Sequence, residues 1–130
     1  MKLAGWPAFL MIGTLLIAQN SLAEDEYPQK DSAEAAVYRG GIVFMHYCQL
    51  CHGPQADGKG RAAKLYDPRP ANLVMSDKNA AYWEMIVRRG GEAMARSKFM
   101  PPWGAELTDE QIHDVLAYLG SINKNPDRPK

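Results

Sequence analysis

Apolar and small residues recur at helical spacing in three stretches of the chain, over residues 33–47, 80–89 and 109–120. Spacings of three and four residues place such positions on one face of a helix, so the pattern predicts three helices. The positions are Ala36, Val37, Gly40, Gly41, Phe44 and Tyr47 in the first stretch, Tyr82, Met85 and Ile86 in the second, and Ile112, Val115, Leu116 and Leu119 in the third.

The third stretch has a clear helix start at Thr108. Thr108 fits an N-cap, and Gln111, three residues later, completes a capping box. Asp109 and Glu110 lie where the helix dipole favours negative charge. Because Gly120 stands where a helix can stop, we predict a closing helix between Thr108 and Gly120.

Two adjacent glycines, Gly40 and Gly41, lie inside the first predicted helix. Each glycine costs a helix about 1 kcal/mol relative to alanine. Their presence therefore indicates the close approach of another backbone, and we expect a second helix to cross at this point.

Length and charge favour one small folded domain. The chain has 130 residues, and its 15 Lys and Arg residues balance its 15 Asp and Glu residues. This balance argues against nucleic acid as a partner. A chain of this size buries a modest share of its surface and often needs a cofactor or a cross-link.

The first 23 residues have the pattern of a secretory signal peptide. Lys2 precedes an apolar run over residues 6–18, and small residues allow cleavage after Ala23. The run of about 13 residues is shorter than the roughly 20 that span a bilayer, although an uncleaved membrane anchor is the alternative. We expect cleavage, a periplasmic protein and no stable membrane insertion.

The remaining chain divides into three parts. Residues 24–34 are charged, contain Pro28 and fit a flexible leader. The folded domain is expected over residues 35–124, and residues 125–130 are expected to form a C-terminal tail.

Cys48, Cys51 and His52 form a complete C-x-x-C-H run, the pattern of covalent c-type haem attachment. On a helical turn, the two-residue gap brings both thiols to one side, where they can add to the haem vinyl groups as thioethers. His52 follows directly and can bind the iron as proximal ligand. The run predicts one covalently bound haem c.

Three other uses of the two cysteines fit the sequence less well. A thioredoxin-like pair needs a preceding strand, whereas this pair follows a predicted helix. A zinc site needs further ligands, and the other histidines, His46 and His113, lack zinc-ligand spacing. A disulfide across two residues gains little stability, because short loops lose little entropy.

With this run near its start, a methionine toward its end and a closing helix, the chain resembles the class I cytochromes c over residues 35–122. The resemblance implies an all-α fold of several helices wrapped around one haem, with a methionine as the sixth iron ligand. It also implies a contact between the first and last helices at small residues and an aromatic. Gly40 or Gly41, Phe44 and Tyr118 fit that contact.

Met100 is the methionine best placed to be the distal iron ligand. Pro101 and Pro102 follow it and stiffen an extended loop, and residues 99–101 look like the distal loop of the family. Met94 is the second choice. The other methionines and histidines fit packing, loop or surface positions; they are Met45, Met75, Met85, His46 and His113.

The segment from Pro68 to Leu73 resembles the family segment whose proline carbonyl accepts a hydrogen bond from the proximal histidine. We assign this role to Pro70 rather than Pro68; such a bond orients the ring and raises its basicity. Arg69 is either a partner for a haem propionate, through a charge-assisted hydrogen bond, or a solvated loop residue.

These features predict an electron carrier rather than an enzyme. With His52 and Met100 on the iron, no position is open for substrate, so electron transfer is favoured. Donor and acceptor proteins are expected to bind transiently. The alternatives are a peroxidase-like enzyme, a haem subunit of a dehydrogenase or oxidase system, or a sensor. Basic residues that fit either partner steering or plain surface are Lys59, Arg61, Lys64, Arg88, Arg89, Arg96 and Lys98.

Overall fold

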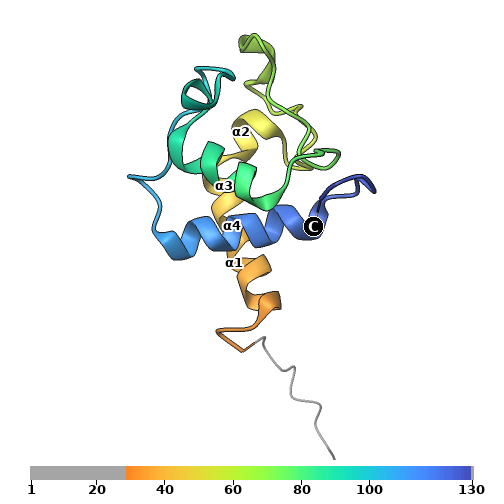
Figure 1. Cartoon of the computed structure of the whole chain (residues 1–130), viewed down its shortest axis with the longest axis vertical. Coiled ribbons are helices and arrows are strands. Elements are labelled where there is room, and N and C mark those ends of the chain that lie inside the picture. The colour runs from red at the N-terminus through yellow and green to blue at the C-terminus, as the bar shows by residue number, and fades with distance from the viewer. Residues whose placement is uncertain (1–28, 130) are drawn as a thin grey trace, which may run out of the picture.

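The computed structural model describes residues 29–129, which form helices joined by loops. The predicted signal peptide, residues 1–23, lies outside them. The α-helices are α1 (Ala33–Tyr47), α2 (Gln49–His52), α3 (Ala80–Arg89) and α4 (Asp109–Ile122), and the short 3-10 helices are η1 (Ala63–Leu65) and η2 (Glu92–Met94). No strand occurs within residues 29–129, and the all-α prediction is confirmed (Figure 1).

The helix bounds agree closely with the sequence. α1 and α3 begin and end where predicted, and α4 has the predicted capping box at its start. Ser32 caps α1, so Ala33 and Glu34, which we assigned to the flexible leader, form its first turn. α4 continues past Gly120 to Ile122, because a glycine weakens a helix without having to end it.

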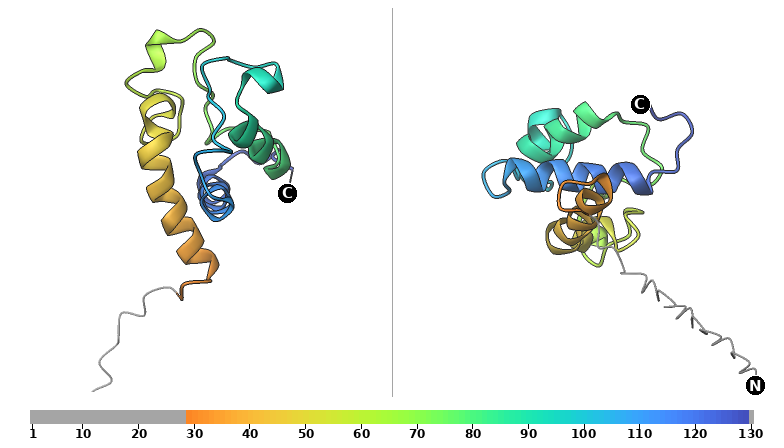
Figure 2. Two further views of the ribbon diagram at one scale, coloured as in Figure 1. Left: turned by 90° about the vertical axis from the view of Figure 1, so that its left-hand side faces the viewer. Right: turned by 90° about the horizontal axis from the view of Figure 1, so that it is seen from below.

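α1 and α4 cross closely at Gly40 (Figures 1 and 2). A Cβ atom on Gly40 would overlap the backbone carbonyl of Asp114 and lie 2.9 Å from Tyr118 Cβ. Gly41 is less crowded, since its Cβ would lie 3.5 Å from the Tyr118 ring. The rings of Phe44 and Tyr118 are 5.3 Å apart. The predicted helix contact is confirmed, with Gly40 at the closest approach.

Arg39 of α1 reinforces the same crossing through an ion pair with Asp114 of α4. Its Nε and Nη2 atoms donate to the two carboxylate oxygens of Asp114 at 2.6 and 3.0 Å. Its Nη1 donates to the Lys30 carbonyl at 2.6 Å. Asp114 is only 2% exposed, and an unpaired charge at such a position would be strongly unfavourable.

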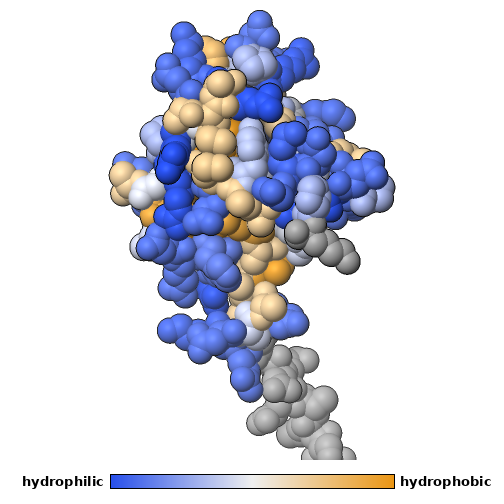
Figure 3. Space-filling model, viewed as in Figure 1, coloured by the Kyte–Doolittle hydropathy of each residue, from blue (hydrophilic) through white to orange (hydrophobic). Residues whose placement is uncertain are grey.

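The hydrophobic core lies where α1, α3 and α4 meet. Its largest fully buried side chains are those of Phe44, Ile112 and Val115. On the face seen in Figure 3, apolar side chains form a band with hydrophilic surface on both sides. Within residues 29–129, no helix combines the length and the apolar character needed to cross a membrane.

Candidate haem site

The end of α1 and the single turn of α2 place the C-x-x-C-H run on the wall of a cavity. The backbone N–H groups of Cys51 and His52 both donate to the Cys48 carbonyl, at 3.2 and 2.9 Å. This turn lets all three residues line one cavity, and both cysteines are free thiols. The structure thus brings together the residues predicted for haem attachment and for the proximal ligand.

We call this the haem cavity. Its volume is about 670 Å³, which lies within the usual range for cofactor sites. Core residues supply much of its wall: Trp83, Val87, Val115 and Leu119 line it, and none is more than 8% exposed. Apolar walls fit the faces of a porphyrin, and thiols with an imidazole fit its vinyl groups and iron. The residues present therefore fit haem c.

Burial and, to a smaller extent, the neighbouring Cys51 raise the pKa of Cys48 to about 12. The Cys48 thiol is therefore neutral at ordinary pH. A thioether is neutral as well, so covalent attachment places no charge at this apolar position, where a charge would be costly.

A backbone carbonyl orients the His52 ring. The Nδ1 atom of His52 lies 3.0 Å from the carbonyl oxygen of Ala71, an acceptor that requires the proton on Nδ1. Burial lowers the pKa of His52, and the Ala71 carbonyl opposes that shift. The neutral ring keeps the lone pair of Nε2, which is the form that binds a metal.

The structure corrects the sequence assignment of this hydrogen bond from Pro70 to Ala71. The Pro70 carbonyl faces Gly58 instead: a Cβ on Gly58 would lie 2.6 Å from the Pro70 oxygen. Neighbouring carbonyls of a non-helical segment point in different directions. With Pro70 turned toward Gly58, the next carbonyl is the one that reaches His52.

Met100 lines the haem cavity, and Met94 does not. The Met100 N–H donates to the Ser97 carbonyl at 3.2 Å, and its carbonyl accepts from Gly91 N–H at 2.8 Å. These two bonds fix the backbone of Met100. Its position on the cavity wall favours Met100 over Met94 as the distal ligand, and this assignment stays a prediction. Met75 also lines the cavity; no motif marked it in the sequence.

Two arginine side chains also line the haem cavity. Arg69 lines the cavity and is exposed, so its contact with a haem propionate stays a prediction. Arg96, predicted only as part of the surrounding basic surface, also lines the cavity. Its Nε donates to the Tyr82 hydroxyl at 3.1 Å. Arg96 and Tyr82 are 14 residues apart in the sequence, so no local pattern predicts that they pair. His46 and His113 are exposed.

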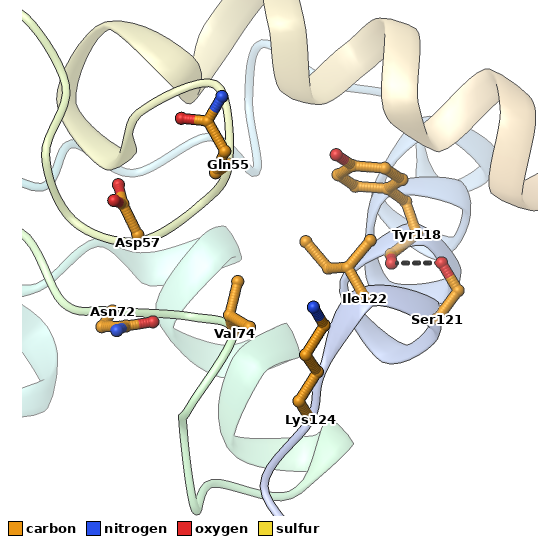
Figure 4. A pocket seen from close by; sticks show the side chains of 8 residues that line it. All are labelled: Gln55, Asp57, Asn72, Val74, Tyr118, Ser121, Ile122 and Lys124. Atoms are coloured by element: carbon orange, nitrogen blue, oxygen red, sulfur yellow. Dashed lines mark hydrogen bonds between the residues drawn. The ribbon is translucent and has the colours of Figure 1, made fainter.

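A second pocket of about 530 Å³ lies between two loops and the end of α4 (Figure 4). Its lining residues are Gln55, Asp57, Asn72, Val74, Tyr118, Ser121, Ile122 and Lys124. Ser121 Oγ donates to the Tyr118 carbonyl at 2.7 Å within it. None of its lining residues is a cysteine, histidine or methionine, so they do not provide the haem ligands that the first cavity offers.

Comparison with known proteins finds a family and several relatives that match most of the folded part of the chain. The family described as cytochrome C oxidase, cbb3-type, subunit III matches residues 35–119. The cbb3-type cytochrome c oxidase subunit FixP of Sinorhizobium medicae (strain WSM419) is 31% identical over 116 residues, which cover 87% of this chain and 39% of that protein. The subunit FixP of Rhizobium meliloti (strain 1021) is 28% identical over 120 residues, covering 90% and 40%. The chain thus spans about two fifths of these relatives.

A solved structure has a similar fold. The Kuenenia stuttgartiensis reducing HAO-like protein complex Kustc0457/Kustc0458 superimposes with a TM-score of 0.55 and 25% sequence identity. The similarity covers 65% of this chain and 41% of the matched chain.

Proposed function

Because this chain belongs to the c-type cytochrome family described as cytochrome C oxidase, cbb3-type, subunit III, we propose that it carries one haem c and passes single electrons between redox partners. Electron transfer is what the family implies. The single haem, its axial ligands, the partners and the location are our proposals.

The observation that carries the proposal is the position of four side chains on one cavity. Cys48, Cys51, His52 and Met100 all line the haem cavity. The two thiols would hold a haem covalently, and the imidazole and the thioether would bind its iron. If both side chains bound the iron, no site would be left for a substrate, which favours a carrier over an enzyme or a sensor.

The chain's own residues tune what the cofactor does. Haem c, when bound, supplies a one-electron couple of its iron. The Ala71 carbonyl holds the His52 ring in one orientation and raises its basicity as a ligand. Buried side chains such as Trp83 and Val87 keep water from the cavity, and a dry cavity disfavours the more highly charged oxidised iron.

We further propose that the protein works in the periplasm, after cleavage of the predicted signal peptide, as a carrier for an oxidase system. Two observations support a docking region at the haem cavity. Leu50 and Phe99 line it while 52% and 44% exposed, and the relatives are named as subunits of an oxidase. Exposed apolar groups beside a redox cofactor suit brief contacts with donor and acceptor proteins.

The optical spectrum of the haem-loaded protein tests the proposal. The ferric protein is expected to show the weak absorption at the red end that reports a methionine sulfur on iron. Met100→Ala should abolish this band and open the reduced iron to carbon monoxide. Met94→Ala and Met75→Ala are matched controls and should keep the band.

Other outcomes have definite meanings. Loss of the band in Met75→Ala, with Met100→Ala unchanged, would make Met75 the distal ligand. A wild-type protein that lacks the band and binds carbon monoxide at once would contradict the carrier proposal and favour an enzyme or a sensor.

A further inference from the structure

The end of the chain folds back onto one wall of the haem cavity. Residues 123–128 follow α4 and lie beyond the part that matches the family, residues 35–119. They contact the loop 73–78. Five residues of this loop line the cavity: Leu73, Met75, Ser76, Asp77 and Lys78. We call residues 123–128 the tail clamp.

The tail clamp holds this loop by its carbonyl groups. Asn123 Nδ2 donates to the carbonyls of Leu73 and Ser76 at 2.9 and 3.1 Å. Asn125 Nδ2 donates to the Met75 carbonyl at 3.0 Å. Between these contacts, the Lys124 N–H donates to the Val74 carbonyl at 2.8 Å. Because the acceptors are backbone groups, these bonds fix the path of the loop itself.

Arg128 links the tail clamp to the buried aromatic wall. Its guanidinium carbon lies 4.0 Å from the centre of the Trp83 ring, and its Nε donates to the Lys78 carbonyl at 3.2 Å. Trp83 is 2% exposed and lines the cavity, and its Nε1 donates to Ser76 Oγ at 3.3 Å. Tail, loop and Trp83 therefore form one connected unit.

We propose that Asn123, Asn125 and Arg128 are positioning residues that hold the 73–78 wall of the haem cavity closed and thereby raise the reduction potential of the haem. The inference rests on the proposed function. Oxidised iron carries one more positive charge than reduced iron, so water that enters through a loosened wall stabilises the oxidised form. Release of the tail clamp lowers the potential for this reason.

Two variants test this in the haem-loaded full chain. Asn125→Ala removes a clamp bond without changing charge, and Arg128→Lys keeps the charge but loses the planar group that stacks on Trp83. Two controls lie at exposed positions outside the clamp. Gln29→Ala also removes a side-chain amide, and Arg89→Lys makes the same change as Arg128→Lys. The readouts are the midpoint potential and the hydrogen exchange of the backbone amides of residues 76–78.

Both clamp variants are expected to lower the potential, and the controls are not. Amides 76–78 should exchange about fivefold faster, the effect of one lost hydrogen bond on a local opening, while α1 amides stay unchanged. Unchanged potentials, with or without faster exchange, would overturn the inference. A third variant, Arg128→Gln, removes the charge as well as the planar group. A lowered potential in Arg128→Gln with an unchanged potential in Asn125→Ala and Arg128→Lys would also overturn the inference, since Arg128 would then act only through its charge. Absence of any reversible one-electron couple in the wild-type protein would instead overturn the proposed function.

Discussion

Gly58 supports the group that orients His52. Its φ angle is +79°, and a Cβ there would press on the Pro70 carbonyl. The Gly58 N–H also donates to the His52 carbonyl at 2.8 Å. A single glycine therefore fixes the backbone of His52 and the segment that carries Ala71.

Gly58→Ala should lower the free energy of unfolding by about 1–3 kcal/mol, because alanine is strained in the left-handed region. The displaced segment should also weaken the bond from His52 to Ala71. Since that bond raises the basicity of the ligand, its loss should raise the reduction potential. Denaturant unfolding and a redox titration measure both effects.

Gln55→Ala is the control for Gly58→Ala, because Gln55 is exposed in the same loop. It should leave stability and potential unchanged. If Gly58→Ala has an unchanged potential, the hydrogen bond to Ala71 does not depend on this turn.

The roles of some site residues can be predicted from the sequence, and those of others cannot. Cys48, Cys51 and His52 can be predicted because the attachment chemistry requires those side chains at a fixed spacing. Ala71 cannot, because it acts through a carbonyl that every residue has, and its direction depends on the turn at Gly58. Met75 reaches the cavity only through the path of its loop.

At the scale of elements, the crossing of α1 and α4 fixes the fold around the haem cavity. α1 leads directly into the turn that carries Cys48 and Cys51, while Val115 and Leu119 of α4 line the cavity. The distance between the two helices at Gly40 therefore sets how the attachment residues face the opposite wall.

Neighbouring glycines of α1 should respond differently to alanine. Gly40→Ala should lower the free energy of unfolding by about 1–3 kcal/mol, as expected for overpacking, because its Cβ meets the backbone of Asp114. Gly41→Ala, with only ordinary contact to Tyr118, should be neutral or stabilise the helix by up to about 1 kcal/mol. Thermal unfolding by circular dichroism compares them, and equal effects would contradict the close crossing at Gly40.

Periodicity and capping residues predict the helices well, since both depend on residues close in sequence. The Thr108 and Gln111 capping box is an example that the structure confirms. The ion pair of Arg39 and Asp114 joins residues 75 positions apart. Its partners become neighbours only once α1 and α4 have packed, so no local pattern reveals it.

At the scale of the whole molecule, the haem cavity lies against the hydrophobic core, in a position that more apolar side chains would fill in a larger protein. Phe44, Trp83 and Val115 all contact it, so the cofactor completes the packing of buried side chains. Small domains have a stability of roughly 5–15 kcal/mol, which leaves little tolerance for an unfilled cavity. Folding and haem attachment should therefore be coupled.

The double variant Cys48→Ala, Cys51→Ala, prepared without haem, should lose its cooperative thermal transition and bind a dye specific for exposed apolar surface. Loss of the cofactor removes a large packing partner from the core. Circular dichroism and dye fluorescence measure the two effects. Met100→Ala keeps the covalent haem and serves as control. A cooperative transition at the wild-type temperature in the double variant would contradict the coupling.

Ionic strength acts differently on the two kinds of charge in this molecule. Salt screens exposed charges over about 10 Å at 0.1 M, whereas the Asp114 carboxylate, 2% exposed, is shielded from ions by the core. Concentrated salt should therefore release a partner held by exposed lysines such as Lys98 and leave the Arg39 pair intact. A salt wash should thus remove a partner bound through such lysines while the protein stays folded.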